Sequence, residues 1–425
     1  MSRAAPLAAG LGFVLSVFTH VARAEVPLAD SGGWVVYTTG RVGGFVELLE
    51  GDGIPRGSND RTLANEGIPV NASPDPNQPL PNANGHASVS RVRSGFLGNI
   101  LSLGVRHAVT DSTQVMGQVS IWSTTETESF RSYQRNYADV REGYLKAEGP
   151  WGSLLVGRAL SLFGRGSTEI DFLYGHGYGV GAPSGFNDNG PSGGHIGFGI
   201  IANIFAGGVV YATPKVAGLQ LSVGYYDPAT PVGAIYKRAK LGRPEAEATY
   251  DAQFTPTSKL HVFVDGAFQK LYDTNGSDDS KNFYGAAAGA RLELGPFRVG
   301  VAAYTGKGLG VNYFLNETDS QLNKATNNPR PFDGGYVQTQ TRVGKFDFNV
   351  GAGITRAHQM TDDLDPRYPN QFIYLKSQMG LSGVVVYHFT DFLHGAFDYF
   401  RADTRWWLGE KQVLNSFNLG ATLTW

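Results

Sequence analysis

The sequence predicts an all-β fold, a transmembrane antiparallel β-barrel of about sixteen strands with one long loop folded into its bore. Three observations predict it. Apolar and polar residues alternate with a period of two in many segments, and the connections between these segments are short and long in turn. The third observation is the stretch 161–206, which is rich in glycine and aromatic residues. A connection of this length in a compact domain normally has a function of its own.

The alternation is clearest in the segments 245–254, 345–355 and 417–425. In the second of them the apolar set is Phe346, Phe348, Val350, Ala352 and Ile354. Such a strand has one apolar and one polar face, so we expect Asp347 and Asn349 to face water. A half-buried sheet in water has the same pattern. Because no amphipathic helices that would cover such a sheet are evident, lipid outside a barrel and water inside it explain the pattern more simply.

The connections fit a barrel with both chain ends on one side of a membrane. Short turns are expected at 110–112, 149–151, 214–218, 255–259, 295–296, 344–345 and 390–391. Longer loops are expected near 50–88, 126–137, 161–206, 227–243, 271–281, 306–333, 356–371 and 403–412. This alternation implies an even number of strands, about sixteen. The first strand can then pair with the last and leave no open edge.

The second predicted strand breaks the alternation. Leu101 and Val105 fall on odd positions, whereas Val92 and Phe96 fall on even ones. A β-bulge near Gly98 would bring both sets to the same face of the sheet.

The N-terminus has the features of a secretory signal peptide. Arg3 precedes a largely apolar run from Leu7 to Phe18, and residues 22–24 (ARA) provide a cleavage site. We therefore expect residues 1–24 to be removed and residues 25–425 to form the barrel. The apolar run is too short for a membrane anchor. No later stretch is apolar enough for a membrane helix.

The composition excludes several classes of protein. The chain of 425 residues has no cysteine, which excludes a disulfide framework and thiolate metal sites. Without the two arginines of the signal peptide, 33 basic residues remain against 37 acidic ones, a charge of −4. This is too small an imbalance to imply a nucleic acid partner. His176 and His195 share the long loop without the spacing of metal ligands. No serine, histidine and acid are grouped to suggest catalysis, so we expect no metal, no cofactor and no enzymatic activity.

Four short motifs follow one another along the chain: 37–42 (YTTGRV), 93–98 (RSGFLG), 152–158 (GSLLVGR) and 211–219 (YATPKVAGL). In order and spacing they resemble motifs of the general diffusion porins of the Gram-negative outer membrane, which are trimeric sixteen-stranded barrels. The final strand, with Phe417 and Trp425, resembles the C-terminal assembly signal of that family, although phenylalanine is its usual last residue.

The resemblance implies a pore constriction between a basic ladder on the wall and acidic residues on the inward loop. Carried over by position, the ladder consists of Arg41, Arg93 and Arg141, with Arg158 nearby. A fourth arginine of the family falls on Ala212 here. The candidate loop residues are Arg165, Glu169, Asp171 and Asp188. Opposed charges make a transverse field at the narrowest point, which polar solutes tolerate better than apolar ones. The missing arginine and the charge of −4 favour a weak cation preference.

The resemblance therefore implies a passive channel for small hydrophilic solutes and ions. It also implies a homotrimer in the outer membrane of a Gram-negative bacterium, in contact with membrane lipids and lipopolysaccharide. A channel selective for sugars, phosphate or oligopeptides is an alternative, since sugar pores use aromatic side chains and the loop contains Phe163, Phe172, Tyr174 and Tyr178. A barrel without a pore, acting as an adhesin or an enzyme, and a soluble secreted β-protein are the others.

Overall fold

The computed structural model describes residues 25–53, 86–94, 98–123, 138–172, 195–231, 235–312, 314–315, 322–323, 326–364, 375–407 and 409–425. The predicted signal peptide, residues 1–24, lies outside this part of the chain, as do Asp188, Tyr174 and Tyr178. Within the described residues, no helix has the length and apolar character needed to cross a membrane.

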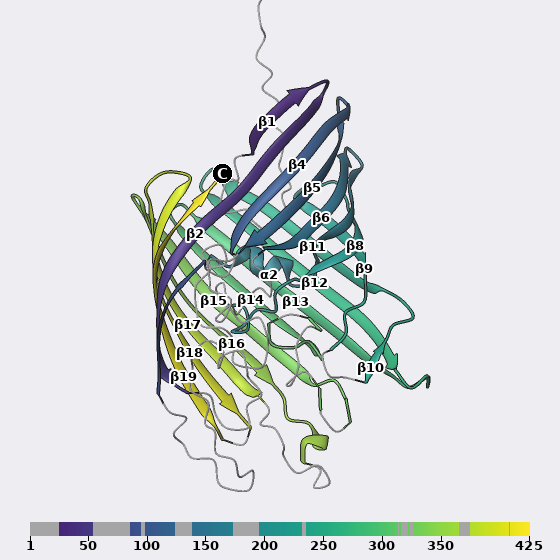
Figure 1. Cartoon of the computed structure of the whole chain (residues 1–425), viewed down its shortest axis with the longest axis vertical. Helices are drawn as coiled ribbons and strands as arrows, with labels where there is room; N and C mark the ends of the chain where they lie inside the picture. Colours follow the sequence, from purple (N-terminus) through teal and green to yellow (C-terminus); the bar gives the residue numbers. More distant parts are fainter. Residues whose placement is uncertain are drawn as a thin grey trace, which may run out of the picture.

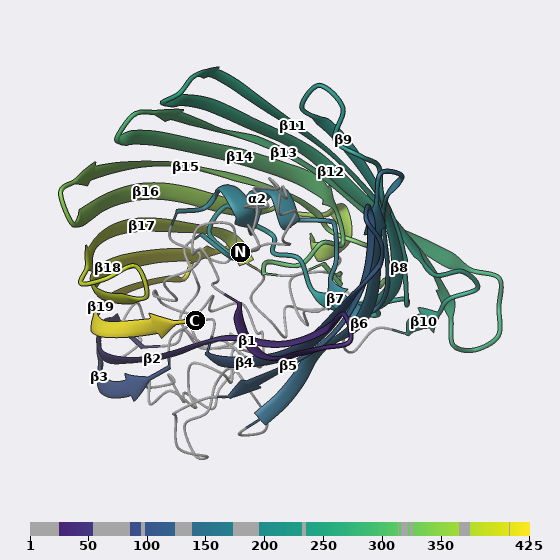
Figure 2. The ribbon, with the colours of Figure 1, turned by 90° about the horizontal axis from the view of Figure 1, so that it is seen from above.

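The described chain forms one antiparallel sheet that curves into a barrel (Figures 1 and 2). Its strands are β1 (Val26–Ser31), β2 (Trp34–Asp52), β3 (His86–Arg93), β4 (Asn99–Thr110), β5 (Thr113–Ser123), β6 (Ala138–Gly149), β7 (Gly152–Leu160), β8 (Phe205–Ala212), β9 (Leu219–Tyr226), β10 (Tyr236–Arg238), β11 (Arg243–Thr255), β12 (Ser258–Asp273), β13 (Ser280–Leu294), β14 (Phe297–Lys307), β15 (Pro331–Val343), β16 (Phe346–Ala357), β17 (Leu375–His388), β18 (Leu393–Trp406) and β19 (Lys411–Thr424). The helices are α2 (Arg165–Ile170) and the 3-10 helix η2 (Thr361–Leu364).

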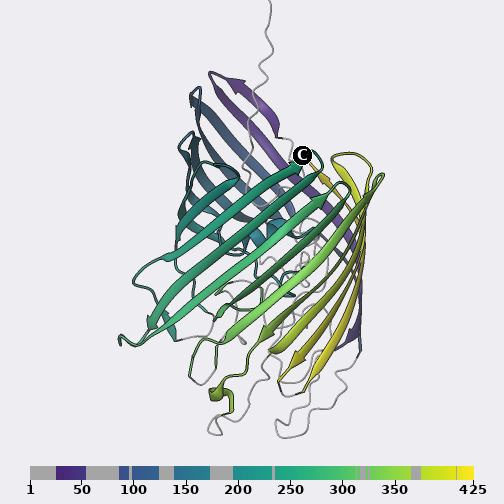
Figure 3. The same ribbon diagram turned by 180° about the vertical axis from the view of Figure 1, so that it is seen from behind.

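The wall of the barrel has the predicted sixteen strands. β2 pairs on one edge with β19 and on the other with β3 and β4, which closes the ring. β3 and β4 follow each other along β2 and together make the second wall strand, while β1 and β10 are short additions to the sheet. All of the predicted short turns join consecutive strands, from β4–β5 to β17–β18. Figure 3 shows β11 to β19 as one tilted, continuous wall.

The predicted faces of the strands are confirmed. In β16, Phe348 is 42% exposed on the outer surface. Asp347 and Asn349 alternate with it and are buried on the inner side. The same alternation runs through the neighbouring strands, because successive side chains of a strand point to opposite faces. The outer face is therefore mainly apolar, and polar groups gather inside.

The break in the second wall strand is larger than a single-residue bulge. β2 pairs through Phe45 with Arg93 of β3 and through Arg41 with Ile100 of β4. Between these pairs β2 advances by four residues and its partner by seven, so three residues are extra. An odd number of extra residues reverses which parity faces inward. The change of parity predicted near Gly98 is therefore present.

The seam of the barrel contains a strand that the sequence did not predict. β19 accompanies β2 as far as Trp425, whose backbone exchanges two hydrogen bonds with Gly40. β1 then pairs with β2 from Thr38 to Trp34. It occupies the edge of β2 that β19 leaves uncovered. β1, β2 and β4 thus project beyond the C-terminal end of β19 (Figure 1).

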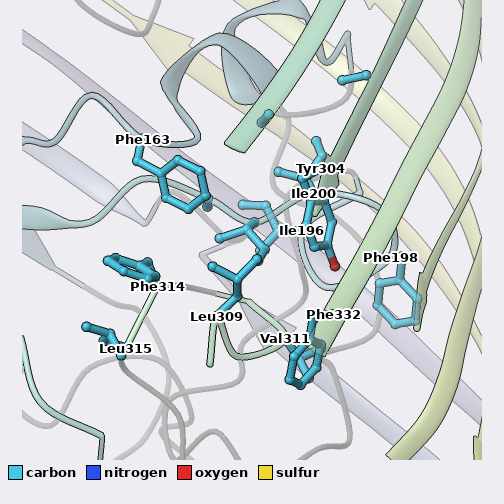
Figure 4. Close-up of a cluster of buried hydrophobic side chains, with 14 of the residues drawn as sticks. Phe163, Ile196, Phe198, Ile200, Tyr304, Leu309, Val311, Phe314, Leu315 and Phe332 are labelled. Carbon is cyan, nitrogen blue, oxygen red and sulfur yellow. The ribbon is translucent and has the colours of Figure 1, made fainter. Parts of the chain in front are cut away.

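One side of the bore is filled by connections that fold inward. α2 lies inside the ring of strands (Figure 2). Residues 195–202, 309–312 and 314–315 contribute apolar side chains to a buried cluster that also contains inward residues of β12 to β15 (Figure 4). The notable case is the connection after β14, which the sequence predicts only as a long loop near 306–333. Its apolar residues, Leu309, Val311, Phe314 and Leu315, are buried inside the barrel.

We predict unequal losses of stability when a lysine is placed at two consecutive positions of β9. Val223 faces outward and is exposed, whereas Ser222 lines the inner cavity. Val223→Lys places a charge in lipid and is expected to cost about 2–4 kcal/mol of unfolding free energy if it lies near the bilayer midplane. Ser222→Lys can extend its amine into polar space and should cost clearly less. Urea titrations of both variants in lipid vesicles measure this difference. An equal loss in both variants would contradict the assignment of the two faces.

Candidate functional site

A polar cavity of about 490 Å³ lies inside the barrel. It is enclosed by inward side chains of β2, β4 to β9 and β11 to β13, with α2 on one side. Cationic and anionic side chains both line it: Arg106, Lys146, Arg165, Lys215 and Arg291, with Glu25, Glu148, Glu169, Glu247 and Asp251. A cavity with this lining can hold water and ions.

Many of the charges around the cavity are paired. Lys146 Nζ lies 2.6 Å from Glu148 Oε2. Asp251 accepts from Lys215 Nζ at 2.6 Å and contacts His261 Nδ1 at 2.8 Å. Arg106 pairs with Glu25 at the start of the described chain. Pairing of neighbouring charges keeps the surface strongly hydrated while limiting its net field.

Three wall carboxylates hold the beginning of the long loop. Glu245 Oε2 accepts from the backbone N–H of Phe163 at 2.8 Å, and Asp265 Oδ2 accepts from that of Gly164 at 3.2 Å. Glu247 accepts two hydrogen bonds from the Arg165 guanidinium, that from Nε at 3.2 Å. These carboxylates project inward from β11 and β12. Bonds of this charge-assisted kind are among the stronger ones in proteins, so the loop starts from a fixed point.

The wall also binds the carbonyl groups of α2. Tyr336 donates its hydroxyl to Ser167 O at 2.8 Å, and Gln338 Nε2 donates to Ile170 O at 2.8 Å. Arg291 Nη1 donates to Glu169 O at 3.1 Å. The last carbonyls of any helix lack partners within the helix. A helix of six residues depends on such outside donors, which here come from β13 and β15.

The returning part of the loop is seated on β16 and β17. Gly199 N–H donates to Thr355 Oγ1 at 3.1 Å, and Gln378 Nε2 donates to Gly197 O at 3.3 Å. The backbone comes so close to β16 that a Cβ atom on Gly353 would overlap the carbonyl oxygen of Phe198. A glycine is therefore required at this point of the wall.

The two described ends of the loop are joined to each other. The buried Asp171 carboxylate accepts from the backbone N–H of His195 at 2.9 Å. The His195 ring stacks on Tyr336, with ring centroids 4.9 Å apart. β8 begins at Phe205, so the loop ends at residue 204, slightly earlier than predicted. The described residues 161–172 and 195–204 thus form one unit that is packed against the inner wall.

Three members of the predicted basic ladder point inward. Arg41 on β2 donates to Thr422 Oγ1 at 3.4 Å, and Arg93 on β3 pairs with Glu47 at 2.9 Å. Arg141 is the extra residue of a bulge in β6, where β5 passes from Ser120 to Ile121 while β6 passes from Glu142 to Val140. β6 lies across the ring from β15 (Figure 2), whereas only β18 and β19 separate β17 from β2. Of the ladder residues, Arg141 on β6 thus lies opposite the wall that seats the returning segment of the loop, while Arg41 and Arg93 are on strands nearer to that wall.

The remaining predicted residues have different positions. Arg158 is exposed, and its Nε donates to the backbone oxygen of Arg141 at 3.0 Å. Glu169 and Arg165 line the cavity, with 4.0 Å between their charged groups. Asp171 is buried within the loop. Asp188 lies outside the described residues. Of the two predicted loop acids that the structure describes, Glu169 lines the cavity and Asp171 does not.

Sequence reasoning missed part of the site. Glu247, Asp251, His261 and Arg291 line the cavity from β11, β12 and β13. Their inward direction was predictable from the alternation, but their distance from the loop was not. No group of three or more His, Asp or Glu residues in the described parts of the chain is arranged to hold a metal ion.

The fold is similar to those of several solved outer-membrane proteins. The outer membrane channel DcaP of Acinetobacter baumannii matches with a TM-score of 0.65 and 15% identity, over 94% of this chain and 100% of that one. An anion-selective porin from Comamonas acidovorans matches with a TM-score of 0.56 and 12% identity, over 92% and 100%. The fold is that of an outer-membrane porin. The trimer form of OmpT, an outer membrane protein of Vibrio cholerae, matches with a TM-score of 0.51 and 14% identity, over 92% and 100%.

The porin fold is recognised here by structure alone. No model of a known protein family matches the sequence, and no curated protein matches it significantly. At sequence identities this low, the structural similarity establishes the fold alone. The chemistry of the bore has to be argued from the residues of this chain.

We predict that Gly353→Ala displaces the returning part of the loop. The new methyl group overlaps Phe198 O, so amide hydrogen exchange in residues 195–204 should become faster. Gly383→Ala on β17 is the matched control, since nothing lies within 4 Å of a Cβ atom there. Exchange followed by mass spectrometry in detergent measures both variants. Unchanged protection in Gly353→Ala would show that the loop is not seated as described.

Proposed function

We propose that this chain forms a water-filled channel for the passive diffusion of small hydrophilic solutes and ions. The observation that carries the proposal is the charged cavity inside a closed barrel, beside a long loop that is packed against one wall. Ionic groups inside a barrel are stable where water occupies the interior. We propose the outer membrane of a Gram-negative bacterium as its location, with lipids and lipopolysaccharide around it.

We propose that the long loop narrows the channel. Its described parts occupy the side of the bore next to β11–β17, which leaves the passage toward Arg41, Arg93 and Arg141. Glu169 would supply negative charge across from these arginines. A transverse field of this kind orders water, which apolar solutes must displace and polar solutes need not. The weak cation preference that we expect depends on Glu169, Glu247 and Asp251.

Of the four aromatic residues of the loop that favour a sugar-selective channel, the structure describes Phe163 and Phe172. Such channels need accessible aromatic rings, but Phe163 and Phe172 are buried. Phe163 packs edge-on against Phe314, with ring centroids 5.4 Å apart. Anion selectivity, the property named for the Comamonas porin, would require the arginines to outweigh the acids that line the cavity. We propose no catalytic role, because the proposed channel needs only the charge and the width of the site.

We further propose export with removal of residues 1–24, and assembly as a trimer like the Vibrio OmpT form. In this mature chain the final strand would serve as the assembly signal. The role of the final strand as an assembly signal is supported by the hydrogen-bonded pairing of Trp425 with Gly40 at the seam.

Removal of Trp425 is expected to impair assembly of the barrel. The truncated strand loses its last two hydrogen bonds to β2 and the aromatic ring that packs over Gly40. Heat-modifiable barrel in outer-membrane fractions, quantified by gel shift, measures the effect. Trp425→Phe should retain assembly, because phenylalanine keeps an aromatic ring and the backbone pairing. Wild-type levels of the truncated chain would contradict the role.

Planar-bilayer recording of the purified protein tests the proposed function. We expect stepwise conductance in potassium chloride, a small preference for cations and no block by added sugar. Glu169→Gln should shift the reversal potential toward anions, because it removes charge that lines the cavity. Arg141→Gln should shift it the opposite way. Screening in physiological salt limits each effect to about 8–10 Å from the charge.

Asp278→Gln is the matched control for these recordings. Asp278 is an exposed acid in the connection after β12 and does not line the cavity. Its loss should leave the reversal potential unchanged. A correctly folded wild-type protein without conductance would favour an adhesin or an enzyme over a channel.

A further inference from the structure

The connection between β14 and β15 forms a second inward element. Its described residues are 308–312, 314–315, 322–323 and 326–330. Leu309, Val311 and Leu315 are fully buried although they belong to a connection (Figure 4). They pack on the inner face of the wall, where a Cβ atom on Gly285 would lie 2.5 Å from Phe163 and 2.6 Å from Leu309. Residues of both inward connections thus meet over the same wall glycine.

This connection contacts the long loop directly. Ala202 of the loop donates its backbone N–H to Asn312 O at 2.8 Å. The Phe163–Phe314 ring contact joins the other described end of the loop to the same connection. Apolar packing between the two elements excludes water from one side of the bore. A displacement of residues 309–315 would therefore remove support from both described parts of the long loop.

A buried ion pair fixes the end of this second element, next to the start of β15. Arg330 Nη1 and Nη2 donate to the two oxygens of Asp363 at 2.6 and 2.8 Å. Both side chains are almost completely buried. Asp363 also accepts from Asn323 Nδ2 at 2.8 Å and from the backbone N–H of Met360 at 2.8 Å. The pair joins the β14–β15 connection to η2, which belongs to the connection after β16.

Arg330 also contacts the beginning of the second element, next to the end of β14. Gly308 N–H donates to Arg330 O at 2.7 Å, beside Leu309. Burial, the largest single influence, would raise the pKa of the Asp363 carboxyl, but the hydrogen bonds and charge of Arg330, together with the hydrogen bonds from Met360 and Asn323, hold the pKa below its usual range. Asp363 is therefore charged at neutral pH. Removing that charge would leave the Arg330 guanidinium buried without its counter-ion, which is costly.

We propose that Asp363 and Arg330 are positioning residues for the channel, because they hold the β14–β15 connection against the long loop and so set the width of the bore. This inference rests on the proposed channel function. It means that the β14–β15 connection, in addition to the long loop, contributes to the constriction. Neither residue lines the cavity, so their effect on ion flow is transmitted through Asn312 and Phe314 to the loop.

Asp363→Asn tests the inference with two independent measurements. We expect faster amide exchange in residues 195–204, which include Ala202, and a larger and noisier single-channel conductance than that of the wild type. Asp278→Asn is the matched control, because it breaks an exposed pair with Lys240 at 2.9 Å that is remote from the bore. It should change neither quantity.

A second pair of variants guards against a failure to fold. Arg330→Met combined with Asp363→Leu removes both charges, and an apolar replacement of a buried pair is often tolerated. This double variant should return exchange and conductance toward wild-type values. Phe314→Ala deletes the contact with Phe163 without touching the ion pair, and it should reproduce the effect of Asp363→Asn.

The results separate this inference from the proposed function. A wild-type protein without conductance contradicts the channel, while the exchange measurement still reports whether the two elements are coupled. A conducting wild type, with exchange and conductance unchanged in both folded Asp363→Asn and folded Phe314→Ala, overturns the positioning role.

Discussion

Closure of the hydrogen-bonded ring is the constraint on which the rest of the structure depends. In a hydrocarbon environment an unpaired backbone group is costly, so a sheet that crosses it must have no open edge. β2 meets this demand with four partners on its two edges. β19 and β1 follow each other along one edge, and β3 and β4 follow each other along the other. Once the ring is closed, the parity of each strand decides which side chains meet lipid and which meet the interior.

The strands and their faces were predictable because both depend on local patterns. Alternation located the inward position of Asp347 and the turns between wall strands. Even the change of parity before Leu101 was visible, although its cause, three extra residues rather than one, was not. β1 escaped prediction because its residues are all exposed and show no buried set. A strand is predicted from the alternation of apolar and polar residues, and β1 shows little alternation.

The contacts inside the bore were much less predictable. The sequence shows that Glu245, Glu247 and Asp265 face inward, but it does not show that the long loop passes within hydrogen-bonding distance of them. Asp171 was chosen for its charge and proved to bind His195 inside the loop. The run from Leu309 to Leu315 had a usable signal, since several apolar residues in a supposed surface loop need a place to be buried. Its partner, the long loop, could be identified only in three dimensions.

The two sides of the ring differ in how well they can accommodate larger side chains on the inner face. Around Gly353 the wall is a mould for the returning part of the loop, and any added side chain collides with it. Among the described residues, none forms such an insert on the inward faces of β4 to β6, which line the cavity at Gln118, Tyr144 and Lys146. A nanopore engineer would therefore retune the passage from β4 to β6, where side chains of other sizes and charges can be exchanged. The half that holds the loops would be left as a scaffold.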